Sequence, residues 1–264
     1  MSLKSKNQSI VVRNVSKTFT LRYHRTLKQM SVAMLRQEDL SDSFLAVNDV
    51  TFSVQQGESI GLMGLNGSGK STLLKMINGI MRPDSGKVLT RGRIAGLIAT
   101  GAGFHPQLTG RDNVYLNGAI LGMSKPEIDA KFDDIVTFAD IGKFLDTEVN
   151  HYSSGMYSRL GFAVAIHTDC DIFLIDEVLA VGDRPFRRKC MRRIEAMRDE
   201  GRTIFYVSHS VGQVKRLCNR ALVLERGRLG FDGPVDAAIH YLHYDEGDEF
   251  DDSPDSDDGQ GDSD

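Results

Sequence analysis

The stretch Gly64-Leu65-Asn66-Gly67-Ser68-Gly69-Lys70-Ser71 fits the pattern G-x-x-x-x-G-K-[ST] of a phosphate-binding loop. The short apolar run Ser59–Met63 before it is typical of a buried strand, and Thr72–Ile77 after it has helical spacing. Glycines let backbone N–H groups converge on an anion, and a helix start adds partial positive charge. A chance glycine turn would lack this context, so the stretch predicts that the chain binds a nucleoside triphosphate.

The loop also suggests a role for each of its side chains. Lys70 is expected to reach the terminal phosphates, and the Ser71 hydroxyl is expected to ligate Mg²⁺. The residues of this stretch predicted to contact the nucleotide are Gly64, Asn66, Gly67, Ser68, Gly69, Lys70, Ser71 and Thr72.

Composition limits the class of protein. The chain has 264 residues, with 41% hydrophobic and 26% charged, which is ordinary for a soluble globular protein with one large α/β domain or two small ones. No run approaches the ~18 apolar residues of a membrane span. Met1–Gln8 is polar and shows no apolar signal region, so we expect the protein to stay in the cytoplasm. Cys170, Cys190 and Cys218 lack metal-ligand spacing and are expected to be buried free thiols.

Charge divides the chain into two parts. Asp245–Asp264 carries eleven carboxylates and no Lys or Arg, whereas residues 1–244 carry 32 Lys and Arg against 25 Asp and Glu. The acidic tail has little to bury, so we expect it to be disordered and to solvate the protein, with contact to a basic partner as the alternative. The basic body suits phosphate-rich ligands or an anionic membrane surface, and its charge does not choose between them.

Strand and helix signals alternate along the body. Strand signals stand at Ile10–Val15, Val47–Val54 and Arg93–Ile98, and a helical insertion is expected over about 109–168. In that insertion, Ser124 and Glu127 form a capping box that opens a helix.

A segment over about 20–45 interrupts the strand pattern. Leu27, Met30, Met34 and Leu35 recur at i, i+3, i+7 and i+8, which predicts an amphipathic helix. That helix could pack on its own domain, or it could dock onto a partner or onto anionic lipid headgroups.

Acidic and imidazole side chains follow two buried strands. Asp176 and Glu177 end the apolar run that begins at Ile172, and Ser208-His209 follows the strand Thr203–Val207. Strands often end in acids, and a lone histidine is usually structural. Beside a phosphate loop, however, we expect Asp176 to hold Mg²⁺ through water, Glu177 to polarise the attacking water and His209 to contact the γ-phosphate.

Taken in order, these motifs over residues 9–235 resemble the ATP-binding cassette (ABC) ATPases. The resemblance implies an α/β fold, an ABC-type P-loop ATPase core with an antiparallel β subdomain and a helical subdomain insertion, within one domain over 1–244. It implies ATP and Mg²⁺ as cofactors and ATP hydrolysis as the activity. It further implies a head-to-tail dimer in which the signature motif Ser153, Ser154 and Gly155 faces the ATP of the second copy, and Ser153 and Gly155 touch its γ-phosphate. Phe19 is the choice for stacking on adenine, with Tyr23 second.

Departures from the usual motifs resemble one subgroup. Tyr152–Met156 replaces Leu-Ser-Gly-Gly-Gln, and Val178–Asp183 replaces Pro-Thr-Ser-x-Leu-Asp. Around Thr100–Arg111 no glutamine stands at the position expected in the family, and Gln107 is not assigned its role. These features look like the ATPase subunits that export lipid-linked polysaccharides such as O-antigen, teichoic acid, capsule or galactan.

The subgroup implies further partners and a location. A separate polytopic permease would carry the lipid-linked glycan, no nucleic acid would bind, and the chain would lie peripherally on the cytoplasmic face of the inner membrane. One alternative is a soluble ABC-type ATPase of DNA repair or translation, although the second cassette or long coiled coil usual there is missing from this sequence. A phosphoryl transferase would explain the phosphate loop, but not Ser153–Gly155 or the helical insertion.

Overall fold

The computed structural model describes residues 7–22, 41–97, 103–176 and 182–242. Its strands are β1 (Gln8–Arg22), β2 (Ser41–Gln55), β3 (Ser59–Met63), β4 (Ser85–Thr90), β5 (Ile94–Leu97), β6 (Ile172–Ile175), β7 (Thr203–Val207), β8 (Arg220–Glu225) and β9 (Arg228–Pro234). Its α-helices are α2 (Lys70–Ile77), α3 (Gly110–Ile120), α4 (Lys125–Ala139), α5 (Ser154–Ile166), α6 (Arg184–Asp199), α7 (Val211–Leu217) and α8 (Val235–Leu242), with 3-10 turns η1 (Gly142–Asp146) and η2 (Val149–His151).

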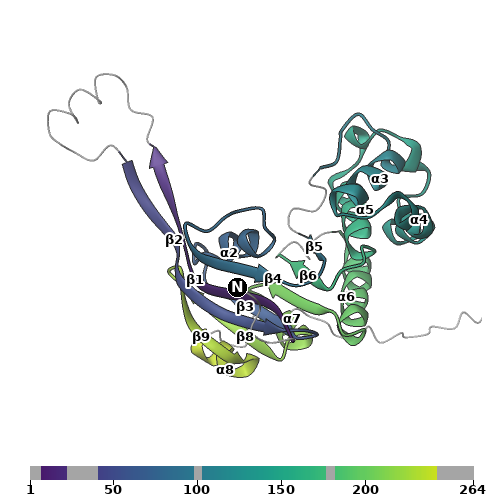
Figure 1. Ribbon diagram of the computed structural model, residues 1–264. Coiled ribbons are helices and arrows are strands. Elements are labelled where there is room, and N and C mark those ends of the chain that lie inside the picture. The colour runs from purple at the N-terminus through teal and green to yellow at the C-terminus, as the bar shows by residue number, and fades with distance from the viewer. Residues whose placement is uncertain (1–6, 23–40, 98–102, 177–181, 243–264) are drawn as a thin grey trace, which may run out of the picture.

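A three-stranded antiparallel sheet has the order β2-β1-β4. Its two long strands pair from Gln8 opposite Gln55 to Arg22 opposite Ser41 and project from the body (Figure 1). The prediction that the amphipathic segment begins near residue 20 and runs to 45 is therefore wrong at both ends, where the chain is β-strand. β-branched and aromatic residues such as Thr18 and Phe19 favour extended backbone once a partner strand lies alongside. The apolar positions proposed for a helix, Leu27, Met30, Met34 and Leu35, lie outside the described residues.

The second sheet has six strands in the order β5-β6-β7-β3-β8-β9. All pairs are parallel except β8 with β9. Every residue of β3, β6 and β7 is buried, because layers cover both faces of the sheet. This is the mixed α/β architecture that the sequence predicted.

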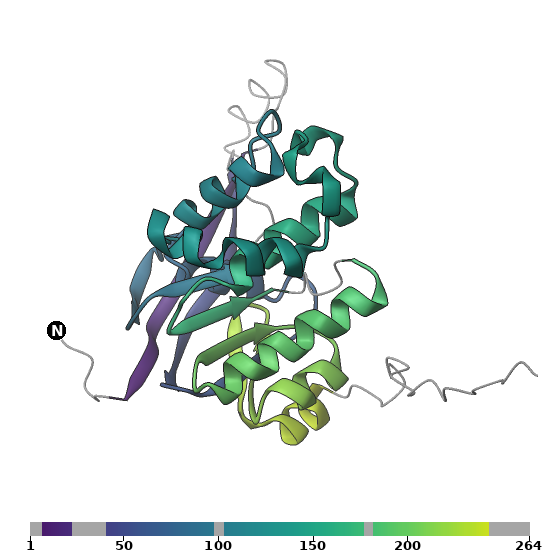
Figure 2. The ribbon, with the colours of Figure 1, turned by 90° about the vertical axis from the view of Figure 1, so that its right-hand side faces the viewer.

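Two hydrophobic cores lie on opposite faces of the six-stranded sheet. One fills the space between the two sheets and includes α2, and Phe52 stacks there on Phe205 with ring centroids 6.1 Å apart. The other packs β6, β7 and β8 against the helices, and Phe162 of α5 and Phe186 of α6 meet in it edge to face. Figure 2 shows α6 in front of the sheet on this side, with α7 and α8 below it.

Helices α3, α4 and α5 form a lobe that stands apart from α2 (Figure 1). The capping box at the start of α4 is confirmed: the Ser124 N–H donates to Glu127 Oε2 at 2.6 Å. Residues Leu160–Ile166 of α5 are all buried, because this helix packs against α3 and α4 as well as against β5 of the sheet. Among the helices of the described residues, none combines the length and the apolar character that crossing a bilayer requires.

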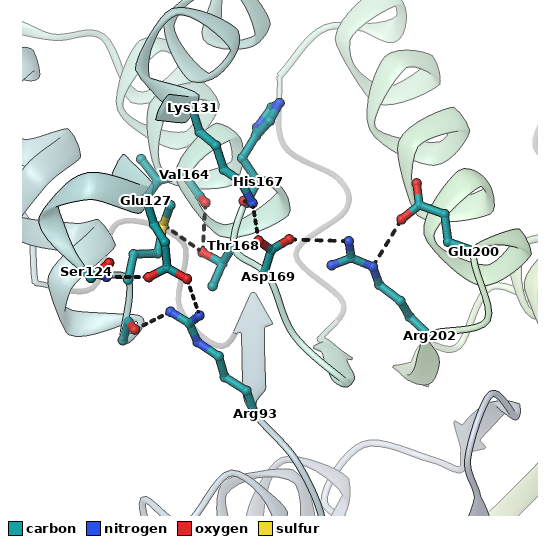
Figure 3. A network of polar contacts seen from close by, with 12 residues as sticks. Arg93, Ser124, Glu127, Lys131, Val164, His167, Thr168, Asp169, Glu200 and Arg202 are labelled. Atoms are coloured by element: carbon teal, nitrogen blue, oxygen red, sulfur yellow. Dashed lines mark hydrogen bonds and ion pairs between the residues drawn. The ribbon is translucent and has the colours of Figure 1, made fainter. Parts of the chain in front are cut away.

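Polar contacts join this lobe to the strand starts at two points (Figure 3). At the first, Arg93 beside β5 pairs with Glu127 of α4 at 3.0 Å. The Ser124 N–H and the Arg93 guanidinium together lower the pKa of Glu127 to about 2. Glu127 therefore caps α4 and fixes it against the sheet at the same time.

The second point is a chain of charges around Asp169. This carboxylate accepts from Lys131 of α4 at 2.7 Å and faces Arg202, just before β7, at 3.5 Å. Arg202 in turn pairs with Glu200 at 3.1 Å (Figure 3). Asp169 is more than half exposed, so the pairing orients the lobe more than it stabilises the fold.

Candidate nucleotide-binding site

The predicted loop between β3 and α2 has backbone with positive φ at Gly64, Gly67 and Gly69, where φ is 137°, 79° and 106°. A Cβ on Gly64 would stand 2.2 Å from the Leu224 oxygen, and one on Gly69 would stand 2.3 Å from the Ala46 oxygen. At Gly67 a Cβ would meet nothing within 4 Å. At Gly64 and Gly69 the loop therefore packs closely against main-chain oxygens of neighbouring strands, whereas Gly67 borders open space.

Main-chain hydrogen bonds join the loop to the turn between β8 and β9, and that turn to β2. The Gly227 N–H, in the turn between β8 and β9, donates to the Ser68 oxygen at 2.9 Å, and the Asn48 N–H of β2 donates to the Gly227 oxygen at 2.7 Å. Ala46 and Gly227 were not predicted as parts of the site. They contact it through main-chain atoms across long sequence separations, so no side-chain pattern marks them.

The loop carries a buried cation. Lys70 is 6% exposed, and its Nζ donates to the main-chain oxygens of Gly64 at 2.7 Å and Leu65 at 3.1 Å. The first hydrogen bond of α2 runs from the Leu73 N–H to the Gly69 oxygen, so the N–H groups of Ser71 and Thr72 have no acceptor within the helix. Donors and positive charge therefore gather at the start of α2.

The remaining loop residues differ in exposure. Asn66, Gly67 and Ser71 are exposed, and Thr72 is half-buried. Ser68 is 5% exposed, and its Oγ has no hydrogen-bond partner among the described residues. A buried hydroxyl without a partner is costly, and an oxygen-rich anion seated on the loop would provide one. The residues present therefore fit a bound triphosphate.

Three parallel strands bring the other predicted residues to the same edge. β7 lies between β3 and β6, and the Ser208 N–H after β7 donates to the Leu62 oxygen of β3 at 3.3 Å. Asp176 follows β6 directly and is half-buried, whereas His209 is exposed. Glu177 lies outside the described residues. The structure thus groups the loop, Asp176 and His209 at the carboxyl ends of adjacent strands, where α/β sheets bind ligands.

The chemistry of these groups suits a metal-bound triphosphate. Hydroxyl and carboxylate oxygens, such as those of Ser71 and Asp176, are the ligands that Mg²⁺ prefers. Lys70 and the helix start supply positive charge, and His209 can donate a hydrogen bond from the next strand.

Aromatic side chains lie on the β1–β2 hairpin above the loop. Phe19, predicted to stack on adenine, is half-buried and stands directly opposite Phe44, which is 49% exposed. Nearby on β2, Val47 Cγ2 would lie 3.5 Å from a Cβ on Gly69 of the loop. Strand β2 therefore passes beside the loop. Phe44 was missed, because it lies within the segment over about 20–45 that interrupts the strand pattern; its cross-strand pairing with Phe19 is visible only in the fold. The second choice, Tyr23, lies outside the described residues.

The predicted signature residues start α5. Ser153 is the N-cap, and its side chain accepts from the Met156 N–H at 3.2 Å. Ser153 and Ser154 are exposed and Gly155 is half-buried. They belong to the helical lobe, which stands apart from α2 in the same chain (Figure 1). The structure therefore does not bring them together with the loop of their own chain.

Comparison with known proteins agrees with this geometry. The sequence profile described as ABC transporter matches residues 47–180. The O-antigen export system ATP-binding protein RfbB of Klebsiella pneumoniae is 40% identical over 230 residues, which is 86% of this chain and 94% of the relative. The teichoic acids export ATP-binding protein TagH of Levilactobacillus brevis is 43% identical over 233 residues, 88% of this chain and 64% of the relative.

A solved structure shares the fold. The dimeric ATP-binding cassette MJ0796 in a post-hydrolysis state with ADP and Pi superposes with a TM-score of 0.67 at 22% identity, covering 86% of this chain and 98% of that one. With the family profile spanning half of the sequence and relatives matching most of it, the chain belongs to the ABC transporter family, as an ATP-binding, ATP-hydrolysing subunit.

Proposed function

We propose that this chain is the ATP-driven motor of an exporter that moves lipid-linked polysaccharide across the cytoplasmic membrane together with a separate permease. The observation that carries the proposal is the 40–43% identity, over most of the chain, to ATP-binding proteins of O-antigen and teichoic acid export. The soluble alternative is not favoured by these relatives. The grouping of the loop, Asp176 and His209 at one sheet edge supports the ATPase part.

In the proposed site, the loop binds the triphosphate and Mg²⁺ supplies charge neutralisation when bound. Lys70 leaves the carbonyls of Gly64 and Leu65 to reach the terminal phosphates. The Ser71 hydroxyl and Asp176 would hold the metal, and Glu177 would take the proton of the attacking water. His209 donates a hydrogen bond to the γ-phosphate, and this contact orients the γ-phosphate for attack by water.

The proposed site is complete only with a second copy. Ser153 and Ser154 are exposed at the start of α5, and a helix start with free N–H groups attracts anions. Because the lobe stands apart from α2 of its own chain, these residues would contact the triphosphate held by the other copy (Figure 1). Contacts available only in the closed pair would make ATP binding close the dimer and hydrolysis reopen it.

The proposed location is the cytoplasmic face of the membrane, peripheral to it and held there by the permease. The substrate is carried by the permease, and nucleic acid plays no part. Under this arrangement the chain needs no contact with the glycan itself.

The test is affinity purification of the full chain from native membranes in mild detergent, followed by protein and lipid mass spectrometry. We expect a polytopic membrane protein in equal amount with bound polyprenyl-linked glycan. Recovery of the chain alone, or with ribosomes or DNA, would overturn the exporter proposal in favour of the soluble alternative.

A paired substitution tests the ATP site separately. Lys70→Ala should weaken triphosphate binding, whereas Lys75→Ala, exposed and one turn further along α2, should bind normally. Equal affinities in the two variants would count against the loop assignment, whatever the permease experiment gives.

A further inference from the structure

Helix α6 is the most basic element of the described residues, with seven Lys and Arg side chains between Arg184 and Arg198. It buries one stripe, which includes Phe186, Met191 and Ile194. The opposite side carries exposed residues, and Figure 2 shows α6 in front of the six-stranded sheet. A helix with this pattern is amphipathic and presents its charge outward.

The carboxylates in the C-terminal half of α6 are matched by arginines. The pairs are Glu195 with Arg216 at 3.2 Å, Asp199 with Arg198 at 2.9 Å and Glu200 with Arg193 at 2.8 Å. Charge in this half of the helix is therefore close to balanced by neighbours.

The part of the helix from Arg184 to Arg192 differs. Arg184, Arg188 and Arg192 are all exposed, and none of them forms a hydrogen bond or ion pair with another described residue. They recur at i, i+4 and i+8, so they lie along one side of the helix and repel one another. We call these three residues the α6 arginine row. No feature of the proposed ATPase site uses it.

The sequence holds a matching negative charge. Asp245–Asp264 carries eleven carboxylates and no cation, and this segment follows α8 after only two residues. α8 contacts α7 through Lys215 and Asp236 at 3.5 Å, and α7 contacts α6 through Arg216 and Glu195. The acidic segment therefore starts from an element two helices away from the row.

Reach does not limit such a contact. An extended chain spans ~3.3 Å per residue, so twenty residues cover roughly 65 Å, whereas the sixteen residues of α6 span about 24 Å. High local concentration favours a segment of the same chain over a free partner of equal charge.

We propose that the acidic segment Asp245–Asp264 docks on the α6 arginine row of the same chain. The contact is electrostatic, so it weakens as salt rises. It covers a basic face of the body that would otherwise bind anionic surfaces unspecifically.

The test uses the full chain with Ser256→Cys carrying a nitroxide label, and records the intensities of backbone amide signals by NMR. The three natural cysteines are buried, and burial raises the pKa of Cys190 and Cys218 to about 12, so the label is selective. At about 50 mM salt, signals of residues 184–192 should lose more than half of their intensity, and about 0.5 M salt should restore them.

Two triple variants distinguish an effect of the α6 arginine row from an effect of positive charge elsewhere on the body. Arg184→Gln, Arg188→Gln and Arg192→Gln together should abolish the loss. Arg82→Gln, Lys87→Gln and Lys143→Gln remove the same charge from exposed positions elsewhere and should leave the loss unchanged. Full intensity over 184–192 in the parent protein at low salt would overturn the proposal.

Two further outcomes would assign the row to another occupant. Signal loss in unlabelled chains mixed with labelled ones would mean that the segment docks on a second copy. Row-dependent sedimentation with phosphatidylglycerol vesicles, without signal loss in the protein alone, would mean that the row binds the membrane. Either result contradicts docking within one chain, and neither depends on the exporter proposal.

Discussion

Phe19 of β1 stands directly opposite Phe44 of β2, in the part of the hairpin that passes beside the phosphate loop. Lys17 Nζ lies 5.9 Å from the Phe19 ring centroid, so this face of the hairpin combines aromatic and positive groups. A half-buried and an exposed aromatic ring, Phe19 and Phe44, next to a triphosphate site offer a surface for a planar base. We therefore propose that the pair extends the ATP site beyond the loop.

We predict that Phe19→Ala and Phe44→Ala each weaken ATP binding. Loss of base–aromatic stacking costs about 1–3 kcal/mol, which is roughly a 5- to 150-fold rise in Kd. Isothermal titration calorimetry with a non-hydrolysable ATP analogue measures this rise. Leu45→Ala removes the neighbouring exposed side chain and is the matched control. If Phe44→Ala binds like Leu45→Ala, Phe44 has no place in the base site.

Gly69 is predicted to be intolerant of any side chain. A left-handed residue other than glycine costs about 1–2 kcal/mol, and here the Cβ would also collide with the Ala46 oxygen. Gly69→Ala should therefore displace the loop and abolish ATP binding. Gly79→Ala is the control, because Gly79 has a similar φ of 76° with nothing within 4 Å. Its thermal midpoint should fall modestly while its ATP affinity stays normal; equal ATP affinities in the two variants would refute the close-contact argument.

His167 should make the fold sensitive to acid. It caps α5, its Nδ1 contacts the Ala163 oxygen at 2.7 Å, and burial against Phe138 lowers its pKa below the ordinary 6.5. The imidazole of His167 therefore takes up its proton at a higher pH in the unfolded chain than in the folded chain. As a result, the free energy of unfolding falls as pH drops from about 6.5 through the folded pKa.

The comparison uses urea unfolding at pH 7 and at about pH 5. His167→Gln should show a smaller loss of stability between the two pH values than the parent protein. His240→Gln, an exposed histidine on α8, should retain the parent's profile. A pH dependence that His167→Gln leaves intact would assign the acid sensitivity to other groups.

Local signals in the sequence predicted much of this architecture. The loop, the capping box at Ser124 and the strand Thr203–Val207 depend on neighbouring residues, and each is found at its predicted place. The grouping of the loop, Asp176 and His209 followed from a general property of parallel sheets.

Contacts between residues far apart in the sequence could not be predicted from the sequence alone. The extension of β1 to Arg22 depends on pairing with β2, and Ala46 and Gly227 contact the loop only through backbone. Helix α7 was missed, since its seven residues Val211–Leu217 carry too short a pattern to distinguish from a loop.

The most direct test of the ATP-driven dimer is the molar mass of Glu177→Gln in solution with ATP and Mg²⁺, measured by light scattering. The substitution keeps the nucleotide site but removes the proposed base, so bound ATP should persist and hold two copies together. We predict a mass of twice the 29.2 kDa of one chain with ATP, and of one chain without it. A variant that stays at 29.2 kDa while binding ATP would contradict the account of a site shared between two copies.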